Sequence, residues 1–409
     1  MVMRLFGAVL MCLIMINTGE AQAAAWPKSP NIEAKSWVLL DARSGQVLAE
    51  DNAHEKLPPA SLTKMMTLYL AFDDLKLGRL KLDEKVSVSQ KAWKIGGSTM
   101  FLEPRMHPTI GELLHGIATL SGNDACIALA EHVAGSESAF VQRMNQKAKE
   151  LGMKDTHFED ATGFPHKNHY STAYDMAVLG AALWRDFPKR YEIFSERSYT
   201  YAGTRQPNRN RLLWTLPGAD GIKTGHTEAA GYCLVGSAAQ ERSRLVSAVF
   251  GTDSDNQRIR QSRVLLQFGF RNFVTLRPTE RDIRRQVEVF QGSEDHVWLL
   301  PSTPVWITVP KGNEKSVSFR LRYPAPLIAP IKAGQNIGTI DAVMKTRQGE
   351  DVLASIPMQA RRGVPQASWF GRKWDAARLW WSNHEAREDN ASEMSATEEN
   401  PSDSEATAQ

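Results

Sequence analysis

The stretch Pro58-Pro59-Ala60-Ser61-Leu62-Thr63-Lys64-Met65-Met66-Thr67 combines the start of a helix with two side chains that can do chemistry. Proline suits the first turn of a helix, because its φ is fixed and it has no N–H to leave unpaired. The apolar residues that follow, up to Phe72, are dense enough to predict a buried helix. Ser61 and Lys64 are three residues apart and so share one face of that helix.

The pair of Ser61 and Lys64 is a candidate for nucleophilic catalysis. A serine hydroxyl is a poor nucleophile until a base takes its proton, and a lysine amine can do so only when burial lowers its pKa. The positive end of a helix dipole also disfavours the ammonium form. No other S-x-x-K occurs in the chain. The tetrad alone is still a weak signal, and a chance pairing on the surface is the alternative.

The first 25 residues have the pattern of a targeting segment. Arg4 precedes an apolar run from Leu5 to Ile16, and residues 21–23 and 23–25 offer small-x-small cleavage sites. This pattern predicts a secretory signal peptide over residues 1–25, and therefore an exported protein. An N-terminal membrane anchor is the alternative.

The formal net charge of +3 conceals an acidic C-terminal tail. Residues 385–409 hold eight acidic residues and one arginine, so the tail carries −7 and the rest of the chain carries +10. The tail is poor in apolar residues and is expected to be disordered. A basic body favours anionic neighbours such as membrane headgroups or an acidic polymer, and nucleic acid is not an expected partner of an exported protein.

The cysteines do not form a disulfide framework. Cys12 falls in the signal segment, which leaves Cys126 and Cys233. An oxidising compartment permits one disulfide between them, but free cysteine is commonly a small core residue, so two buried thiols are the favoured interpretation. The sequence has no zinc-ligand spacing, and neither a metal nor another cofactor is expected.

The apolar runs predict an α/β domain over residues 26–286. Residues 36–50 have the pattern of a β-hairpin, and residues 231–250 that of two strands joined by a turn near 240–244. Helical patterns occupy the interval, over 111–134 with a break near Ser121-Gly122, 139–151 and 172–184. Short alternating runs with many Pro and Gly turns then predict a small all-β domain over 287–364.

Residues 365–384 form a further region, rich in tryptophan and basic side chains. On a helical wheel the large rings share one broad arc, and they are Trp369, Phe370, Trp374, Trp380 and Trp381. The segment is too short and too charged to span a bilayer, which needs about 20 apolar residues. Tryptophan prefers the membrane interface, so we predict an amphipathic anchor helix on the membrane surface. A helix packed on the β domain is the alternative.

Two triplets that follow Ser61 add to the candidate catalytic set. Ser121-Gly122-Asn123 comes first and Lys223-Thr224-Gly225 comes later, followed by His226. Each triplet is a weak signal alone. In this order, after an S-x-x-K, they are a strong signal for penicillin-recognising serine enzymes.

Each side chain of the triplets suits a task in such a cleft. Lys223 on an edge strand is a fixed cation that attracts a substrate carboxylate, and Thr224 can hydrogen-bond the same group. Gly225 lets a substrate backbone approach closely, and Asn123 offers both a donor and an acceptor to a substrate amide. Ser121 can relay a proton to a leaving group, and two backbone N–H groups must hold the developing oxyanion.

Longer passages resemble the low-molecular-weight penicillin-binding proteins, the D-alanyl-D-alanine carboxypeptidases. The matching passages are 59–67, 121–125, 170–176, 207–210 and 220–227, and the likeness extends over residues 30–384. The resemblance implies a penicillin-binding and serine β-lactamase-like transpeptidase fold, in which helices flank an antiparallel sheet. It further implies a small C-terminal all-β domain, an amphipathic membrane helix, and a place at the periplasmic face of the bacterial inner membrane.

The resemblance also implies the catalytic roles. Ser61 would be the acylated nucleophile and Lys64 its general base. Ser121 and Lys223 would pass a proton to the departing D-alanine. The backbone N–H groups of Ser61 and His226 would form the oxyanion hole.

The implied substrate is a peptidoglycan stem peptide that ends in D-Ala-D-Ala, and β-lactams are implied as covalent inhibitors. Asn123 would hold the substrate amide. Thr224 and Arg209 would bind the terminal carboxylate beside Lys223 and Gly225.

Three alternatives to a D,D-carboxypeptidase stay open at the level of sequence. A serine β-lactamase needs a base that activates water for deacylation. We considered four glutamates between the two triplets, and none lies in the E-x-x-x-N context of class A enzymes. They are Glu131, Glu137, Glu150 and Glu159. A D,D-endopeptidase would differ only in the leaving group that the cleft accepts. A non-catalytic wall-binding scaffold would have no need of the full set of motifs.

Overall fold

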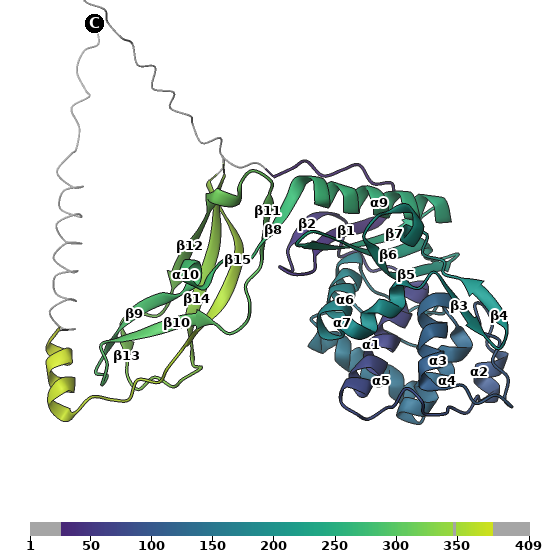
Figure 1. The fold of residues 1–409 in the computed structure, drawn as a ribbon, viewed down its shortest axis with the longest axis horizontal. Helices are drawn as coiled ribbons and strands as arrows, with labels where there is room; N and C mark the ends of the chain where they lie inside the picture. Colours follow the sequence, from purple (N-terminus) through teal and green to yellow (C-terminus); the bar gives the residue numbers. More distant parts are fainter. Residues whose placement is uncertain (1–25, 347–348, 379–409) are drawn as a thin grey trace, which may run out of the picture.

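The computed structural model describes residues 26–346 and 349–378, which form two bodies joined at a two-stranded ribbon (Figure 1). The predictions for the signal peptide over 1–25, for Trp380 and Trp381, and for the acidic tail over 385–409 concern residues outside this range.

The larger body is built on a five-stranded antiparallel sheet in the order β2-β1-β7-β6-β5. Its strands are β1 (Ser36–Asp41), β2 (Val47–Asp51), β5 (Ala219–Thr227), β6 (Gly231–Gln240) and β7 (Ser243–Thr252). The hairpin predicted over 36–50 and the strand pair predicted over 231–250 are therefore confirmed. Strands from both ends of the body pair with each other, and β5 lies at the edge, as predicted for the strand that carries Lys223.

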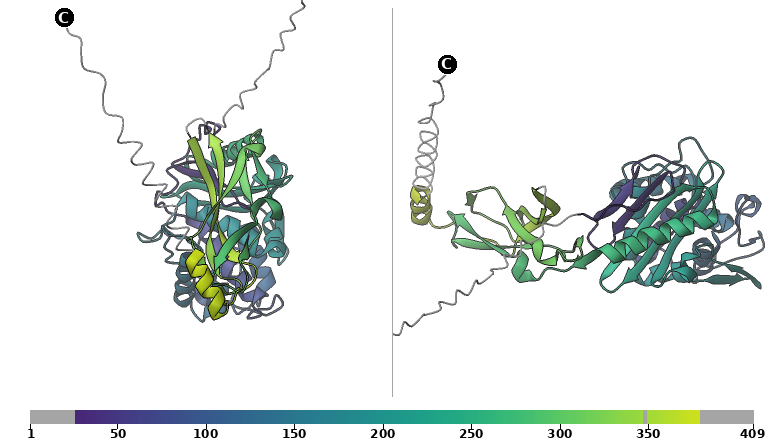
Figure 2. Two further views of the ribbon diagram at one scale, coloured as in Figure 1. Left: turned by 90° about the vertical axis from the view of Figure 1, so that its left-hand side faces the viewer. Right: turned by 90° about the horizontal axis from the view of Figure 1, so that it is seen from above.

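Helices cover both faces of this sheet, and the side chains of β1 alternate between them. Trp37 and Leu39 pack in a cluster with Leu265 of α9 (Asp255–Asn272), which lies along the outer face of the sheet (Figure 2). Val38 faces the opposite way, into the larger core. Successive side chains of a strand point to opposite faces, so a continuous apolar strand is buried on both sides.

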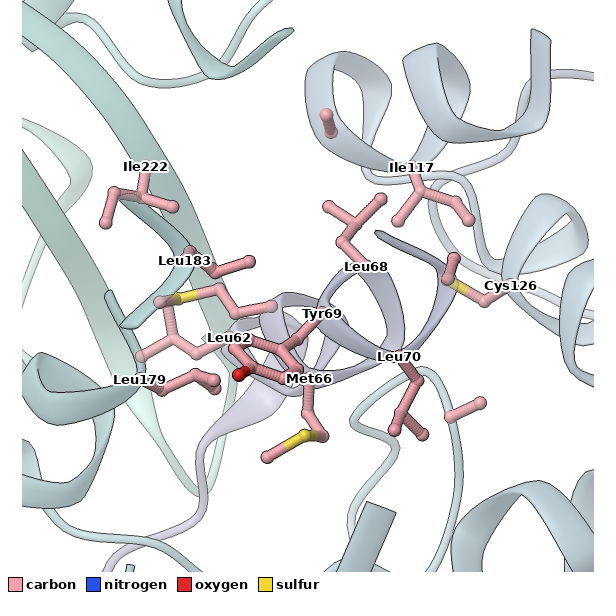
Figure 3. Close-up of a cluster of buried hydrophobic side chains, with 14 of the residues drawn as sticks. Leu62, Met66, Leu68, Tyr69, Leu70, Ile117, Cys126, Leu179, Leu183 and Ile222 are labelled. Carbon is pink, nitrogen blue, oxygen red and sulfur yellow. The ribbon is translucent and has the colours of Figure 1, made fainter. Parts of the chain in front are cut away.

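Helix α1 (Lys64–Lys76) occupies the centre of the larger core, directly after a 3-10 turn over Ala60–Thr63. Eleven of its 13 residues are buried. Figure 3 shows its side chains between those of α6 (Ala173–Asp186), such as Leu183, and Ile117 on the other side. A helix that is buried on all sides belongs in a core. The turn with the candidate nucleophile Ser61 comes directly before α1, so the position of α1 fixes that turn.

The other helices predicted from the sequence are confirmed, with one local departure from α geometry. The break predicted near Ser121-Gly122 is a π-helical turn over Gly116–Leu120, after which Ser121 has a left-handed backbone with φ 65°. π-helical turns often occur at functional sites. The remaining helices and short strands of this body are α2 (Gln90–Lys94), α3 (Ile110–His115), α4 (Asn123–Ala134), α5 (Glu137–Glu150), α7 (Pro188–Tyr191), α8 (Leu212–Thr215), β3 (Ser198–Tyr201) and β4 (Thr204–Pro207).

Several helices in this body begin at a residue whose side chain caps the first turn. Thr172 accepts a hydrogen bond from the backbone N–H of Asp175 at the start of α6. Thr109 and Glu112 form a reciprocal capping box at the start of α3. These side chains satisfy N–H groups that have no partner within the helix.

The smaller body has its own apolar core and a six-stranded sheet in the order β12-β14-β15-β10-β9-β13. The predicted C-terminal all-β domain is thus confirmed. Its elements are α10 (Glu280–Ile283), β9 (Arg285–Phe290), β10 (His296–Pro301), β12 (Val317–Arg322), β13 (Leu327–Ile328), β14 (Asn336–Thr346) and β15 (Gly349–Ala360), and the ribbon beside it pairs β8 (Phe273–Leu276) with β11 (Ile307–Pro310).

Polar contacts and a stacked cation hold the ribbon against the β1–β2 hairpin. The backbone N–H of Thr308 donates to Gln46 Oε1 at 2.6 Å, and Gln46 Nε2 donates back to the Thr308 carbonyl at 3.2 Å. The Arg43 guanidinium lies 5.1 Å from the Trp184 ring centre of the larger body and 4.7 Å from that of Trp306. Cation–π contacts of this kind stabilise an interface when the cation is shielded from water.

Cys126 and Cys233 are both buried, and both are free thiols. The interpretation as two core thiols is therefore confirmed. Burial raises the pKa of the Cys126 thiol to about 12, which keeps it protonated and unreactive.

The burial of α1 generates a prediction about stability. Leu68→Ala should lower the free energy of unfolding by about 2–5 kcal/mol, because Leu68 is fully buried and its loss leaves a cavity. Leu77→Ala is the matched control at the end of the same helix, where Leu77 is 58% exposed, and it should cost less than about 0.5 kcal/mol. Urea denaturation followed by circular dichroism measures both, and equal losses would contradict the central position of α1.

Candidate active site

Most of the predicted site residues line one pocket of about 380 Å³, beside the edge strand β5. The predicted residues on its wall are Ser61, Ser121, Asn123, Arg209, Thr224, Gly225 and His226. Lys64 and Lys223 are buried outside this lining set, with 0% and 3% of their surface exposed. A larger and more apolar hollow of 690 Å³ lies between α1 and α7, but it contains none of the predicted residues.

Ser61 and Lys64 are in direct contact. Lys64 Nζ donates to Ser61 Oγ at 3.0 Å and to the carbonyl oxygen of Thr162 at 2.6 Å. Burial lowers the pKa of Lys64, so the amine is more easily neutral than an ordinary lysine. Sequence reasoning did not identify Thr162, because its contribution comes from a backbone carbonyl that any residue could supply.

Ser121 and Asn123 reach the pocket because α3 and α4 do not form one continuous helix. The interruption lies at residues 116–122, which end in the left-handed backbone of Ser121 and in Gly122. Asn123 is the first residue of α4, and its backbone N–H donates to the carbonyl of Ser98 at 2.7 Å. Its Nδ2 donates to the carbonyl of Gly96, also at 2.7 Å. One of the two N–H bonds of Asn123 Nδ2 is therefore used within the protein, which leaves the second N–H and Oδ1 for a substrate amide.

Lys223 lies on β5 with its amine turned towards protein atoms. Its Nζ donates to the carbonyl of Thr224 at 3.1 Å. Burial lowers the pKa of Lys223 well below its usual range, and the positive charges of Lys64 and Arg209 lower it further. Burial thus disfavours the ammonium form of Lys223, the form expected from the sequence, and a substrate carboxylate beside the amine would favour that form.

Gly225 has a second function besides the predicted access for substrate. A Cβ atom on this residue would lie 3.0 Å from the carbonyl oxygen of Pro59 and 3.3 Å from the Ala60 Cβ. Such distances are shorter than ordinary contacts. The absence of a side chain therefore lets β5 pack against the turn that carries Ser61.

Two arginines give the pocket a positive wall. Arg209 is exposed on its rim, where it was expected. Arg258 from α9 also lines the pocket, donates to the carbonyl of Gly225 at 2.9 Å and pairs with Asp255. The sequence analysis did not identify Arg258. Its place near the start of α9, next to Ile259 on the buried side of the helix, was a usable signal that the arginine is buried. None of the described lining residues is Asp or Glu, so the pocket suits an anionic ligand.

The larger body is an antiparallel sheet flanked by helices, and one pocket gathers a Ser–Lys pair, an S-x-N triplet and a K-T-G edge strand. This combination defines the class of penicillin-recognising active-site serine enzymes. Comparison with known families narrows this class. Residues 22–254 match the D-alanyl-D-alanine carboxypeptidase family of S11 peptidases, and residues 275–366 match the C-terminal domain of penicillin-binding protein 5. The chain belongs to the D-alanyl-D-alanine carboxypeptidase family.

Individual proteins give the same result. The chain is 42% identical to D-alanyl-D-alanine carboxypeptidase DacC of Escherichia coli over 358 residues, 85% of this chain and 88% of the relative. The crystal structure of penicillin-binding protein 5 from Haemophilus influenzae superposes with a TM-score of 0.78 at 37% identity, covering 83% of this chain and all of that one. Penicillin-binding protein D2 from Listeria monocytogenes, in its ampicillin-bound form, superposes with a TM-score of 0.56 at 29% identity, covering 60% of this chain and 100% of that one.

These likenesses confirm the family and the enzyme class predicted from the motifs, a serine-type D-alanyl-D-alanine carboxypeptidase. They also confirm the transpeptidase fold with its C-terminal all-β domain.

The buried amine generates a prediction about pH. The resemblance implies Lys64 as the base, a role that requires its neutral form. Because its pKa is lowered, the acylation rate should rise with pH and reach its plateau at lower pH than an ordinary lysine would allow. Lys64→Arg keeps a cation that cannot act as a base, and it should lower the plateau rate by about 10²- to 10⁴-fold. Lys76→Arg, on the exposed end of α1, is the control. Stopped-flow measurements with a fluorescent penicillin give the profiles, and an unchanged plateau in Lys64→Arg would exclude Lys64 as the base.

Proposed function

We propose that this enzyme removes the terminal D-alanine from peptidoglycan stem peptides through an acyl-enzyme on Ser61. The observation that carries the proposal is the contact between Ser61 Oγ and the fully buried Lys64 amine at the wall of a positively charged pocket. A buried amine of lowered pKa next to a serine is the arrangement that nucleophilic catalysis requires.

Acylation begins when neutral Lys64 takes the hydroxyl proton of Ser61. The Ser61 oxygen then bonds to the carbonyl carbon of the penultimate D-alanine, and the carbonyl electrons move onto its oxygen. The backbone N–H groups of Ser61 and His226 hold this oxyanion. Collapse of the tetrahedral intermediate breaks the bond to the nitrogen of the terminal D-alanine, which leaves as an amine after receiving a proton.

Ser121 and Lys223 relay the proton from the Lys64 ammonium to the leaving nitrogen, which returns Lys64 to its neutral form. Water then attacks the acyl ester, and the Lys64 amine takes a proton from this water. Lys64 returns the proton to Ser61 Oγ as the ester bond breaks, and the shortened peptide leaves as a carboxylic acid that ionises in solution. Lys64 is thus proposed to act as the base in both half-reactions.

Substrate recognition is proposed to use the two ends of the scissile dipeptide. Asn123 Oδ1 accepts the amide N–H of the peptide, and the bond from Nδ2 to the Gly96 carbonyl holds the Asn123 amide in place. Thr224, Arg209 and Lys223 receive the terminal carboxylate, whose negative charge stabilises the ammonium form of Lys223. Gly225 keeps this wall of the pocket free of side-chain atoms.

The composition of the pocket supports a peptidase over a β-lactamase. Rapid hydrolysis of a β-lactam ester in class A enzymes uses a glutamate to activate water. The described lining residues include no carboxylate. Glu137, one of the glutamates considered from the sequence, instead accepts the Ala161 N–H and pairs with Lys91. A penicillin is therefore expected to acylate Ser61 and to leave slowly.

Mass spectrometry of the mature protein after brief exposure to penicillin tests the proposal. We expect one covalent penicillin adduct that remains on the protein for much longer than one catalytic cycle. The Ser61→Ala variant should show no adduct. The wild-type protein should also release D-alanine from a D-Ala-D-Ala peptide. Drug turnover without an adduct would indicate a β-lactamase, release of a cross-linked partner peptide would indicate an endopeptidase, and neither adduct nor turnover would leave a scaffold.

We further propose that the enzyme is exported, with residues 1–25 as its signal peptide, and acts at the periplasmic face of the bacterial inner membrane. In this proposal residues 26–286 are the catalytic domain, 287–364 the β domain, 365–384 a surface anchor and 385–409 an acidic tail. In the described part of the chain, no helix is both long enough and apolar enough to cross a membrane.

The described start of the anchor segment, a helix over residues 369–378, supports this proposal. Its polar side faces the β domain, because Asp375 accepts the Gln291 N–H at 2.7 Å and Arg378 pairs with Glu288. Its large rings face away from the protein and are exposed by 57% for Trp369, 79% for Phe370 and 72% for Trp374. Exposed tryptophans beside basic residues favour a membrane interface. The alternative, a helix packed on the β domain, accounts for the polar side of these residues but not for the three exposed rings.

The exposed rings generate a prediction about membrane binding. Deletion of residues 367–409 should release the protein from anionic vesicles in a sedimentation assay. Replacing Trp369, Phe370 and Trp374 together with serine should weaken binding strongly, because each ring contributes apolar contact at the interface. Trp93→Ser with Trp214→Ser, two rings that are each 46% exposed on the larger body, is the control and should bind as the parent does. Sedimentation of the truncated protein with vesicles would show that the anchor lies elsewhere.

A further inference from the structure

We propose that Asp160 and His169 are positioning residues for the general base, which they hold in line with Ser61 through the loop at residues 160–164. The inference rests on the proposed role of Lys64 as base. It concerns what fixes the direction of the Lys64 amine, rather than the amine's own chemistry.

The Asp160 carboxylate ties the loop into one conformation. Its Oδ1 accepts hydrogen bonds from Thr162 N at 2.7 Å, Thr162 Oγ1 at 2.7 Å, Gly163 N at 2.6 Å and Phe164 N at 3.3 Å. Burial alone would raise the pKa of Asp160, but hydrogen bonds from His169 and Thr162 hold it below the usual range, so the carboxylate stays charged. A single charged oxygen therefore organises three successive residues of the loop.

His169 connects this loop to the helix that carries the base. Its side chain is 1% exposed, its Nδ1 lies 3.2 Å from Asp160 Oδ2, and its Nε2 lies 2.9 Å from Thr63 Oγ1. A neutral imidazole with its proton on Nδ1 satisfies both contacts, because Nδ1 donates to the carboxylate and Nε2 accepts from the Thr63 hydroxyl. Thr63 is the residue directly before Lys64.

The loop and His169 together contact one face of the helical segment at four positions, three of them through the loop. Thr162 O accepts from Lys64 Nζ at 2.6 Å, and Ala161 O accepts from Thr67 Oγ1 at 2.7 Å. A Cβ atom on Gly163 would lie only 1.8 Å from the Ala60 carbonyl oxygen. With Thr63, these contacts fall at positions 60, 63, 64 and 67, the i, i+3, i+4, i+7 spacing of one helix face.

The consequence for catalysis follows from the geometry of a neutral amine, which has two N–H bonds and one lone pair. The Thr162 carbonyl fixes one N–H, so the lone pair and the second N–H share the two remaining directions, one of which leads to Ser61 Oγ. If the loop relaxes, the amine can turn away, and the proton transfer loses its alignment. A small misplacement of a catalytic group can cost about 10²-fold in rate.

Isosteric substitutions test the proposal. Asp160→Asn removes the charge that gathers the loop, and Thr63→Val removes the hydroxyl that binds His169 while keeping the volume of the buried side chain. Both should lower the first-order acylation constant for a fluorescent penicillin by about 10- to 100-fold at plateau pH, with little change in the non-covalent dissociation constant. Thr63→Ser keeps the hydroxyl and should retain the parent rate.

Asp175→Asn is the matched control. Asp175 is also a buried aspartate that accepts from a neighbouring loop, through Asp155 N at 2.9 Å and Thr156 Oγ1 at 2.7 Å, but it does not contact residues 160–164. It should leave the acylation constant unchanged. The measurements are made below the unfolding temperature of every variant, with the active fraction counted from the amount of bound penicillin.

The outcomes separate this inference from the function on which it rests. Parent rates in both Asp160→Asn and Thr63→Val, together with a large loss in Lys64→Arg, would overturn only the positioning role. A parent rate in Lys64→Arg would overturn the proposed base itself. If Asp160→Asn does not fold, Thr63→Val and Thr63→Ser decide the question alone.

Discussion

The hydrogen bond between Lys64 Nζ and Ser61 Oγ depends on a lysine held in a place from which water is excluded. An unpaired ammonium in such a place costs several kcal/mol, and this cost is what shifts the amine towards its basic form. The surrounding apolar core, centred on α1, is therefore part of the catalytic device. Its packing sets the electrostatics of the pair, and the loop at 160–164 supplies the carbonyl that the amine still needs as a partner.

The same constraint explains the opposite wall of the pocket. Lys223 is also buried, and its charge is disfavoured both by burial and by the nearby cations Lys64 and Arg209. A positive charge on Lys223 is therefore unfavourable, and a substrate carboxylate would offset this cost as well as make new bonds. Gly225 brings this strand close to the Ser61 turn, so the two walls can act on one substrate.

Much of this arrangement could be predicted from the residues. The order of the three motifs identified the family, and the apolar runs located the sheet and the β domain. Two cysteines make no disulfide framework, so the common role of free cysteine as a core residue favoured two buried thiols. Other parts carried no usable pattern. The Thr162 carbonyl is a backbone group, and the link from Asp160 through His169 joins residues nine apart whose meeting depends on how a loop folds. The orientation of the Asn123 amide likewise depends on where the Gly96 carbonyl lies.

The identity of the reactive side chains is thus a property of the chain, because a hydroxyl, an amine and an amide at the right spacing already limit the chemistry that is possible. Their protonation and direction are decided by tertiary packing. Burial lowers the pKa of both lysines, hydrogen bonds keep Asp160 charged, and the contacts of one loop with one helix face aim the Lys64 amine. These effects depend on distances between segments far apart in sequence, which local patterns do not encode.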